Sequence, residues 1–365
     1  MFNAFKVKNF RGISNLDIDN LKEINVFVGD NGSCKTTILD ALYILLNPNN
    51  AQLIVASNIF RNIDVIDSNF WKSYFNDFDV SKAIGLEAKN EILKKVSITP
   101  ILSTEKIVGD KSNVRSSSEM EENINGFNVK FDVNKKTYST KIELSLQMPM
   151  ALRQNEADML MSFTPVMMRF KSKPDENYME ESIGHYFNNW TINNNNEIGA
   201  KFDAVNQKIG KEEIIDFLRK MGVPVKDIEL NSSKRLVVRD ERFSKRVLFN
   251  TYGDGVIHSF NIFLSSLHAP GGVTLIDEIE NGLHWTKQKI LWKAINKIAG
   301  EKKQQIFATT HSREMLTHLY EAAKEDDFLN KINLFRLERK DGGLEAVSYG
   351  PDELEYALSS NIEVR

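Results

Sequence analysis

The sequence predicts an α/β fold with a parallel sheet, and three segments carry this prediction. Near the N-terminus, a short apolar strand at Ile24–Val28 leads into a glycine-containing loop and then an apolar helix at residues 36–46. Two further apolar strands, at Val273–Ile276 and Gln305–Thr309, each lead into polar residues that can carry chemistry. Such runs are typical of strands buried on both faces of a parallel sheet, whose carboxyl ends meet at one edge.

The composition is that of an ordinary globular protein without a global charge bias. The chain has 365 residues, of which 41% are apolar and 27% charged, and its formal net charge is −3. No basic field marks it as a nucleic-acid-binding protein. The single cysteine, Cys34, excludes an intrachain disulfide and fits a reducing compartment. The apolar runs are too short to span a bilayer and the charged N-terminus does not resemble a signal peptide, so we expect a cytoplasmic protein without a membrane partner.

The pattern divides the chain into three parts. Residues 1–48 and 236–365 carry the α/β pattern and are predicted to form one head domain. Residues 80–147 alternate like strands, and the alternation at 127–133 resumes at 138–146, which predicts an antiparallel hairpin within an antiparallel β part of the head. Residues 150–235 are expected to form a mostly helical insertion used for interaction or oligomerisation. Residues 103–125 are expected to form a polar loop, and no sustained heptad is present.

The loop after the first apolar strand has the pattern of a phosphate-binding loop, with the sequence GDNGSCKT over residues 29–36. Backbone N–H groups of such a loop cradle phosphates at the positive end of a helix. Lys35 would reach the β and γ phosphates of ATP, and the Thr36 hydroxyl would bind Mg²⁺. The departure is Cys34, where glycine is usual. A side chain there could crowd the nucleotide, but cysteine is small and is tolerated if the local φ is negative. The alternative is a degenerate loop that binds ATP but hydrolyses it poorly.

The second strand delivers two acids to the same edge of the predicted sheet. Asp277 and Glu278 follow Val273–Ile276, at the edge where ligands of open α/β sheets bind. Asp277 would hold Mg²⁺ directly or through water, and Glu278 would orient and activate the attacking water. The alternative is a strand capped by two surface acids, which the phosphate-binding loop makes the weaker interpretation.

Two further motifs complete the pattern. The strand Gln305–Thr309 is followed closely by His311, whose imidazole can hydrogen-bond a γ-phosphate and report its loss. The segment Thr251-Tyr252-Gly253-Asp254-Gly255 opens an apolar helix. Glycines at a helix N-terminus form an anion site, although a simple turn and cap has the same sequence pattern.

These four motifs, in this order, resemble the ABC-type ATPases of the OLD-like group, which are related to SMC and DNA-repair ATPases. Residues 7–12, with the sequence VKNFRG, resemble the group's N-terminal motif, whose arginine lies near the nucleotide. Residues 29–36 resemble Walker A, residues 277–284 resemble Walker B and the D-loop, residues 251–255 resemble a weak signature motif, and residue 311 resembles the switch histidine. The implied fold is a P-loop ATPase of the ABC type.

Pattern and resemblance together predict the site residues. Catalysis is assigned to Glu278, His311 and Lys35, and Mg²⁺ binding to Thr36 and Asp277. The ATP-binding residues are Arg11, Asn31, Gly32, Ser33, Cys34, Lys35, Thr36, Thr37, Gly253, Asp254 and Gly255.

The resemblance also implies an ATP-dependent assembly. In the group, ATP lies between two heads, so that Gly253 and Gly255 of one head would meet the γ-phosphate held by the partner's Lys35. Many OLD proteins carry a Toprim nuclease domain after the ATPase, and too few residues follow His311 to supply one. A separate Toprim-type nuclease is therefore the expected effector. Stand-alone ATPases of this kind often occur in bacterial phage-defence systems, of which the PARIS system is the named example we would choose.

The sequence departs from the group's pattern in the signature, where the usual serine is missing unless Thr251 substitutes for it. The Q-loop has only weak candidates, Gln147 and Gln154. Four other interpretations remain: a ring-type AAA+ motor, an SMC-like DNA-repair ATPase, a transporter ATPase and a non-hydrolysing scaffold that binds ATP. The long separation of Lys35 from Asp277 argues against a ring-type AAA+ motor. The missing heptads argue against an SMC-like DNA-repair ATPase, and the weak signature argues against a transporter ATPase.

Two minor hypotheses concern charge and redox chemistry. A basic cluster is the best candidate for binding nucleic acid, although an exposed strand face with alternating charges is the simpler interpretation. Its members are Lys234, Arg235, Arg239, Arg242, Lys245 and Arg246. Cys34 would be a redox-active thiol if the helix N-terminus lowered its pKa.

Overall fold

The computed structural model describes most of the chain. The described residues are 1–59, 61, 63, 69–90, 93–103, 123–147, 167–173, 175–176, 178, 184–187, 195–268, 271–340 and 343–360. The predicted polar loop at 103–125 lies almost wholly outside them, as does Gln154, while Gln147 ends a strand. No helix in these residues is both long and apolar enough to cross a membrane.

A six-stranded sheet forms the centre of the head, in the order β16-β15-β3-β14-β13-β9. Its strands are β16 (Gly343–Tyr349), β15 (Ile332–Lys340), β3 (Ile24–Val28), β14 (Gln305–Thr309), β13 (Val273–Ile276) and β9 (Gly184–Phe187). All but β16 run parallel. The three apolar strands predicted from sequence are central and fully buried, which is why they read as continuous apolar runs. The predicted α/β fold class is confirmed.

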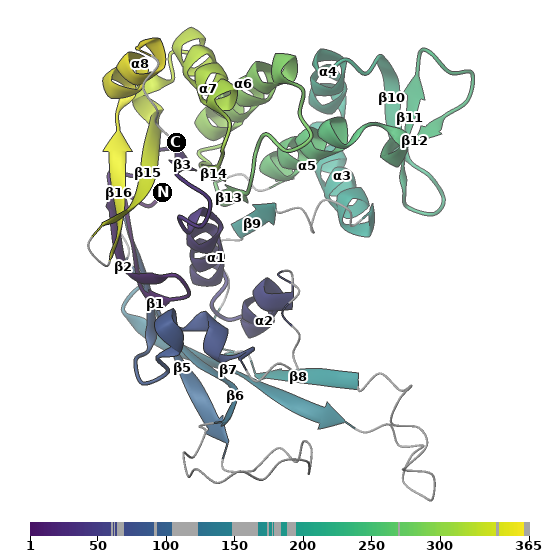
Figure 1. The fold of residues 1–365 in the computed structure, drawn as a ribbon. Helices are drawn as coiled ribbons and strands as arrows, with labels where there is room; N and C mark the ends of the chain where they lie inside the picture. The colour runs from purple at the N-terminus through teal and green to yellow at the C-terminus, as the bar shows by residue number, and fades with distance from the viewer. Residues whose placement is uncertain are drawn as a thin grey trace, which may run out of the picture.

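Helices cover this sheet on both faces, and β3 contributes to both cores. Ile24, Val26 and Val28 pack in the core under α5 (Asp254–His268), α6 (Trp285–Glu301) and α7 (Arg313–Glu325). Phe27 points to the opposite face, into the core that contains α1 (Lys35–Leu46) and α2 (Ala51–Ile59). Figure 1 shows α6 and α7 above the strands, α1 below them, and α8 (Pro351–Ser359) beside β16. The alternation along β3 follows from the two-residue period of a strand.

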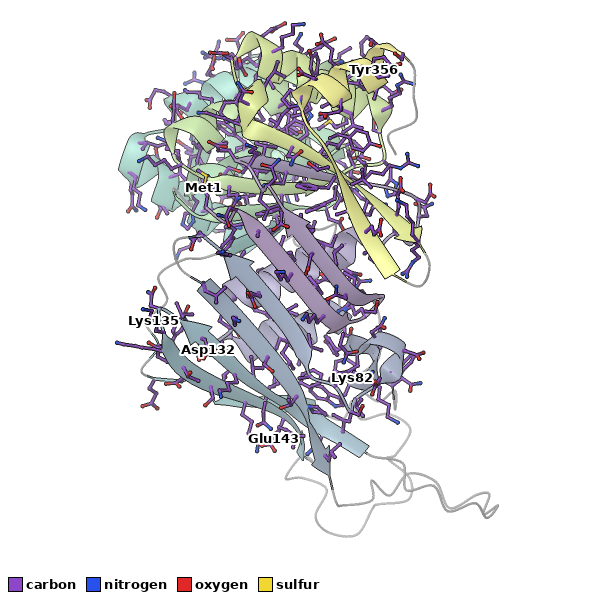
Figure 2. All side chains as sticks on the ribbon, turned by 90° about the vertical axis from the view of Figure 1, so that its left-hand side faces the viewer. Met1, Lys82, Asp132, Lys135, Glu143 and Tyr356 are labelled. Atoms are coloured by element: carbon purple, nitrogen blue, oxygen red, sulfur yellow. The ribbon has the colours of Figure 1, made fainter. Side chains whose placement is uncertain are left out.

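A second, seven-stranded antiparallel sheet lies next to the first, in the order β2-β1-β4-β5-β6-β7-β8. Its strands are β1 (Ala4–Phe10), β2 (Ile13–Asp19), β4 (Ile84–Lys89), β5 (Leu93–Ser103), β6 (Asn123–Val133), β7 (Lys136–Gln147) and β8 (Met167–Lys173). The predicted hairpin is β6–β7. Its turn residues Asn134 and Lys135 both have positive φ, as a two-residue hairpin requires. Figure 2 shows this sheet face-on, with Lys135 at the end of the hairpin.

The segment predicted as a mostly helical insertion contributes helices and strands to several parts of the head. Helices α3 (Asn195–Ile209) and α4 (Glu212–Lys220) pack in the same core as α5. Strand β9 extends the central sheet beside β13. Strands β10 (Val225–Leu230), β11 (Leu236–Asp240) and β12 (Val247–Leu248) form a small third sheet, seen at the right of Figure 1. The predicted domain boundaries and the insertion's interaction role stay predictions.

A buried histidine gives the fold a predicted pH dependence. His258 on α5 is 3% exposed, and burial lowers its pKa from 6.5 to about 4. Between these values the unfolded state binds a proton that the folded state excludes, so the free energy of unfolding falls as pH decreases through this window. The slope from this group is at most about 1.4 kcal/mol per pH unit.

We expect His258→Leu to flatten the pH dependence of urea unfolding between pH 6.5 and 4, relative to the wild type. Both proteins carry the same other titrating groups, so the difference between their curves isolates His258. Parallel curves over this range would contradict a depressed folded-state pKa.

Candidate nucleotide-binding site

The phosphate-binding loop connects the end of β3 to the start of α1. Gly29 and Gly32 have φ of +141° and +82°, in the region that favours glycine. A Cβ on Gly29 would lie 2.7 Å from the Leu337 carbonyl oxygen, so no larger residue fits there. The loop therefore has the backbone turns that a phosphate cradle needs.

Lys35 lies inside this loop. Its Nζ donates to the carbonyl oxygens of Gly29 at 2.7 Å and Asp30 at 2.9 Å, and to Ser33 Oγ at 3.2 Å. Burial lowers the pKa of this ammonium from its usual value, and the charge of Asp277 acts in the opposite direction. The ammonium is held by the same loop that would cradle phosphates, within the first turn of α1.

The predicted Mg²⁺ ligands meet directly. Thr36 Oγ1 donates to Asp277, 3.1 Å from Oδ1 and 3.0 Å from Oδ2. Burial raises the pKa of Asp277, while the hydroxyls of Thr309 and Thr36 favour its charged form. One hydroxyl and one carboxylate, with phosphate oxygens and water completing the shell, fit the ligand set that Mg²⁺ takes. Among the described residues, no three or more His, Cys, Asp or Glu side chains form a cluster that could hold a metal ion on its own.

Thr309 ties the two acids together, and sequence reasoning did not assign it a role. Its Oγ1 donates to Asp277 Oδ1 at 2.6 Å and accepts from the Glu278 backbone N–H at 2.8 Å. Glu278 has φ of +49°, a strained backbone for a residue with a side chain. The hydroxyl at the end of β14 thus fixes the backbone that presents Glu278. The only signal in the sequence was a threonine at a strand end.

His311 follows β14 and is anchored by its backbone. Its N–H donates to Glu280 Oε1 at 2.6 Å, which ties the residue to the segment after β13. Glu280 belongs to the segment that resembles a D-loop, and nothing in the sequence signals this contact with residue 311. The turn after β14 is therefore connected to the turn after β13 by both Thr309 and Glu280.

A cavity of about 560 Å³ opens over this loop, a volume in the range of ligand pockets. Nine predicted residues line it: Arg11, Asn31, Gly32, Ser33, Cys34, Lys35, Thr36, Thr37 and His311. The rest of the lining includes residues between 58 and 78, and Arg339 from β15, none of which the sequence analysis singled out. Asp277 adjoins the cavity through its bond to Thr36.

Arg11 lines the cavity, but its charge is paired within the protein. Its guanidinium lies 3.1 Å from Asp40 Oδ2, and the two side chains are 8% and 4% exposed. Its Nη2 also donates to Ser57 at 2.7 Å and Asn58 at 3.1 Å. Arg61 binds the same Asp40 oxygen at 2.7 Å. Arg11 thus lines the cavity beside the phosphate-binding loop, and Asp40 of α1 holds it there.

Cys34 departs from the expectation of a negative φ. Its φ is +68°, in the left-handed region, because the chain must turn sharply from the loop into α1. Arg339 Nη2 lies 3.3 Å from the thiol, and a Cβ on Gly12 would lie 2.7 Å from it. Burial raises the pKa of Cys34 and outweighs the nearby positive charge of Arg339. The surroundings of Cys34 therefore favour the neutral thiol, and not the thiolate that a helix N-terminus would stabilise.

The signature residues lie outside this cavity. Helix α5 begins at Asp254, and a Cβ on Gly255 would lie 2.1 Å from the Gly282 carbonyl oxygen, so the signature packs against the predicted D-loop. Gly253 has open space around it. None of Gly253, Asp254 and Gly255 is among the residues that line the cavity. One chain therefore does not bring its own signature to its own phosphate-binding loop.

The basic cluster is partly neutralised on the small third sheet and its connecting turns. Arg242 pairs with the fully buried carboxylate of Asp240 at 2.7 Å, and Arg246 pairs with Glu229 at 2.9 Å. The bond to Arg242 holds the pKa of Asp240 well below its usual range. These ion pairs support the simpler interpretation of a charged surface.

Known proteins resemble the chain along most of its length. A family model described as AAA ATPase domain matches residues 1–316. A protein named ATP/GTP phosphatase from Helicobacter pylori is 24% identical over 399 aligned residues, covering 98% of this chain and 97% of that protein. A solved SMC head bound to the C-terminal winged-helix domain of ScpA covers 98% of this chain and 99% of its own at 14% identity, with a TM-score of 0.49. The SMC head from Thermotoga maritima aligns over 95% of this chain and 98% of its own, at 12% identity and a TM-score of 0.44.

Thr309→Val should weaken the metal site without removing a predicted ligand. It deletes the hydroxyl that binds Asp277 and the Glu278 N–H but keeps the shape of the side chain. We expect the Mg²⁺ concentration that half-saturates Mg²⁺-dependent nucleotide binding to rise about 10-fold or more, as for other residues that orient a ligand. Thr310→Val is the matched control, because its hydroxyl accepts from Ser312 instead. Equal effects of the two variants would contradict this role.

Cys34→Gly and Cys34→Ala should separate backbone strain from the thiol. Both remove the contact with Arg339, but only glycine adopts a φ of +68° without cost. We expect Cys34→Gly to be more stable than Cys34→Ala by about 1 kcal/mol, since the left-handed penalty exceeds the extra entropy of an unfolded glycine. Urea unfolding of both variants gives the difference. Equal stability would contradict the left-handed conformation.

Proposed function

The chain belongs to the AAA ATPase domain family, and on that premise we propose that it is an ABC-type ATPase that binds ATP with Mg²⁺ and hydrolyses it. The observation that carries this proposal is the direct contact of Thr36 with Asp277 beside Lys35. A helix N-terminus, a buried lysine and a hydroxyl–carboxylate pair are among the parts that phosphoryl transfer to water uses. They come from β3, α1 and β13, which are distant in the sequence.

Each residue has a role that its position supports. Lys35 would exchange its carbonyl partners for β and γ phosphate oxygens, and the loop N–H groups would cradle the same phosphates. Thr36 and Asp277 would hold Mg²⁺, which neutralises charge on the phosphates. Glu278, fixed by Thr309, would orient the attacking water, and His311 would contact the γ-phosphate.

We further propose that the complete site forms between two copies of this chain. Gly253 is open, and Gly255 lies at the N-terminus of α5, away from the cavity of its own chain. A helix N-terminus attracts anions. Facing the partner's bound ATP, this terminus would supply the missing contact to the γ-phosphate, so that ATP holds the assembly together and hydrolysis releases it.

The biological role that we propose is that of an OLD-like switch that controls a separate effector protein. The specific case is a Toprim-type nuclease in bacterial antiviral defence, as in the PARIS system. This rests on the sequence resemblance. An SMC-like DNA-processing ATPase is the second candidate. The left-handed Cys34 favours a third, a scaffold that binds ATP without turnover, because its side chain lies next to the phosphate loop.

Glu278→Gln tests the proposed hydrolysis and assembly together. We expect turnover to fall at least about 100-fold, because the amide cannot accept the proton of the attacking water, while ATP binding persists. Mass in solution should rise with ATP and Mg²⁺ and stay high in the variant. Lys35→Ala is the control, since it should lose ATP binding and therefore assembly.

The scaffold proposal predicts a different result. Neither the wild type nor Glu278→Gln would then turn over ATP, and mass would be the same with and without nucleotide. Turnover without any change of mass would instead contradict a site shared between two copies.

A further inference from the structure

The part of the cavity formed by residues 75–78 has an aromatic side chain that the fold leaves exposed. Phe78 ends the short 3₁₀ turn Asn76–Phe78, lines the cavity and is 54% exposed. Its neighbours Phe75 and Asp77 also line the cavity. The loop residues that would hold phosphates come from residues 31–37 of the same lining. One continuous cavity thus joins a phosphate cradle to an aromatic ring and a carboxylate.

The turn is fixed to the head before any ligand arrives. Phe75 pairs with Phe10 at the end of β1, and the Arg11 N–H donates to the Tyr74 carbonyl at 2.8 Å. Asn76 Nδ2 donates to the Arg11 carbonyl at 2.7 Å. These bonds run to the same β1–β2 turn that adjoins the phosphate loop through Gly12. The position of Phe78 relative to Lys35 is therefore set by the fold.

The backbone of this turn is strained at two consecutive residues. Asp77 and Phe78 have φ of +53° and +56°, in the left-handed region, which aspartate enters more readily than most residues and a bulky aromatic residue rarely enters. Such conformations persist only where the surroundings impose them, and they cluster at ligand sites. Here the strain turns a phenylalanine away from the core that its neighbours Phe75 and Tyr74 fill.

We propose that Phe78 is the platform on which the base of the bound nucleotide stacks, and that Asp77 accepts a hydrogen bond from the base's N–H groups. This rests on the proposed nucleotide-binding function and names its base specificity. Stacking on an aromatic ring tolerates every base but favours the larger purines. A carboxylate accepts from the exocyclic amine of adenine or the N–H groups of guanine. Because the larger purines stack over more of the ring, the site takes purine nucleoside triphosphates, and ATP and GTP bind more tightly than CTP.

The test compares ligands with and without a base on the full-length protein. Calorimetric titration with Mg²⁺·ATP and with Mg²⁺·tripolyphosphate measures the base and the phosphate sites separately. We expect Phe78→Ala to weaken ATP binding about 10-fold or more and to leave tripolyphosphate binding unchanged. Phe78→Trp should retain ATP affinity, because the larger ring still stacks. Asp77→Ala should weaken the binding of ATP and leave tripolyphosphate binding unchanged, because it removes an acceptor for the N–H groups of the base.

Phe243→Ala is the matched control, since Phe243 is another exposed phenylalanine, on a turn of the small third sheet and outside this cavity. It should bind ATP like the wild type. Unchanged ATP affinity in Phe78→Ala, or an equal loss for ATP and tripolyphosphate, would overturn the assignment of Phe78 to the base. CTP binding as tight as ATP would overturn the purine preference.

The proposed function fails in a different way. A wild-type protein that binds neither ATP nor tripolyphosphate would overturn nucleotide binding itself, and the base site with it. A wild type that binds both ligands, with a Phe78→Ala variant that also binds both equally well, would keep the proposed function and overturn only the base platform.

Discussion

The partly buried carboxylate of Asp277 is the constraint on which the site depends. It accepts hydrogen bonds from Thr36 on α1 and Thr309 on β14, so it joins the carboxyl ends of three neighbouring strands. A buried carboxylate without donors would be costly, and this makes both hydroxyls part of the fold as well as of the site. The positions of Lys35, Glu278 and His311 follow from the same junction.

A second junction connects the antiparallel sheet to the phosphate-binding helix. Asp40 on α1 pairs with Arg11 from the β1–β2 turn and with Arg61 beyond α2. Buried ion pairs add little net stability, but removing one partner leaves an uncompensated charge, so such pairs strongly favour one arrangement. The turn at Phe75–Phe78 is tied to the same β1–β2 turn through Arg11 and Phe10. The phosphate-binding end of the cavity and its aromatic end are therefore both attached to the β1–β2 turn.

These two junctions lie within one chain, while the proposed signature residues lie outside its cavity. The phosphate loop, the acids and the cavity wall are fixed within one head, while the signature helix α5 is packed on the D-loop and directed elsewhere. A second copy that supplied its α5 N-terminus would complete the anion site with backbone dipoles. The chemistry proposed here would then be coupled to assembly, because the two copies together would supply the parts of each site.

The sequence by itself determined the elements whose signals are local. Continuous apolar runs predicted β3, β13 and β14, and alternation of apolar and polar residues predicted the β6–β7 hairpin. The motifs next to these strands pointed to Lys35, Thr36, Asp277 and their neighbours. In each case the period of the apolar residues and the adjacent polar residues were a sufficient signal. Only the tertiary structure decided the left-handed φ of Cys34, the pairing of Arg11 with Asp40, the contacts of Thr309 and Glu280, and the exposure of Phe78. The φ of Cys34 is a local backbone angle that no residue pattern specifies. The other features depend on segments far apart in the chain, and a long-range contact leaves no period or motif in a single sequence.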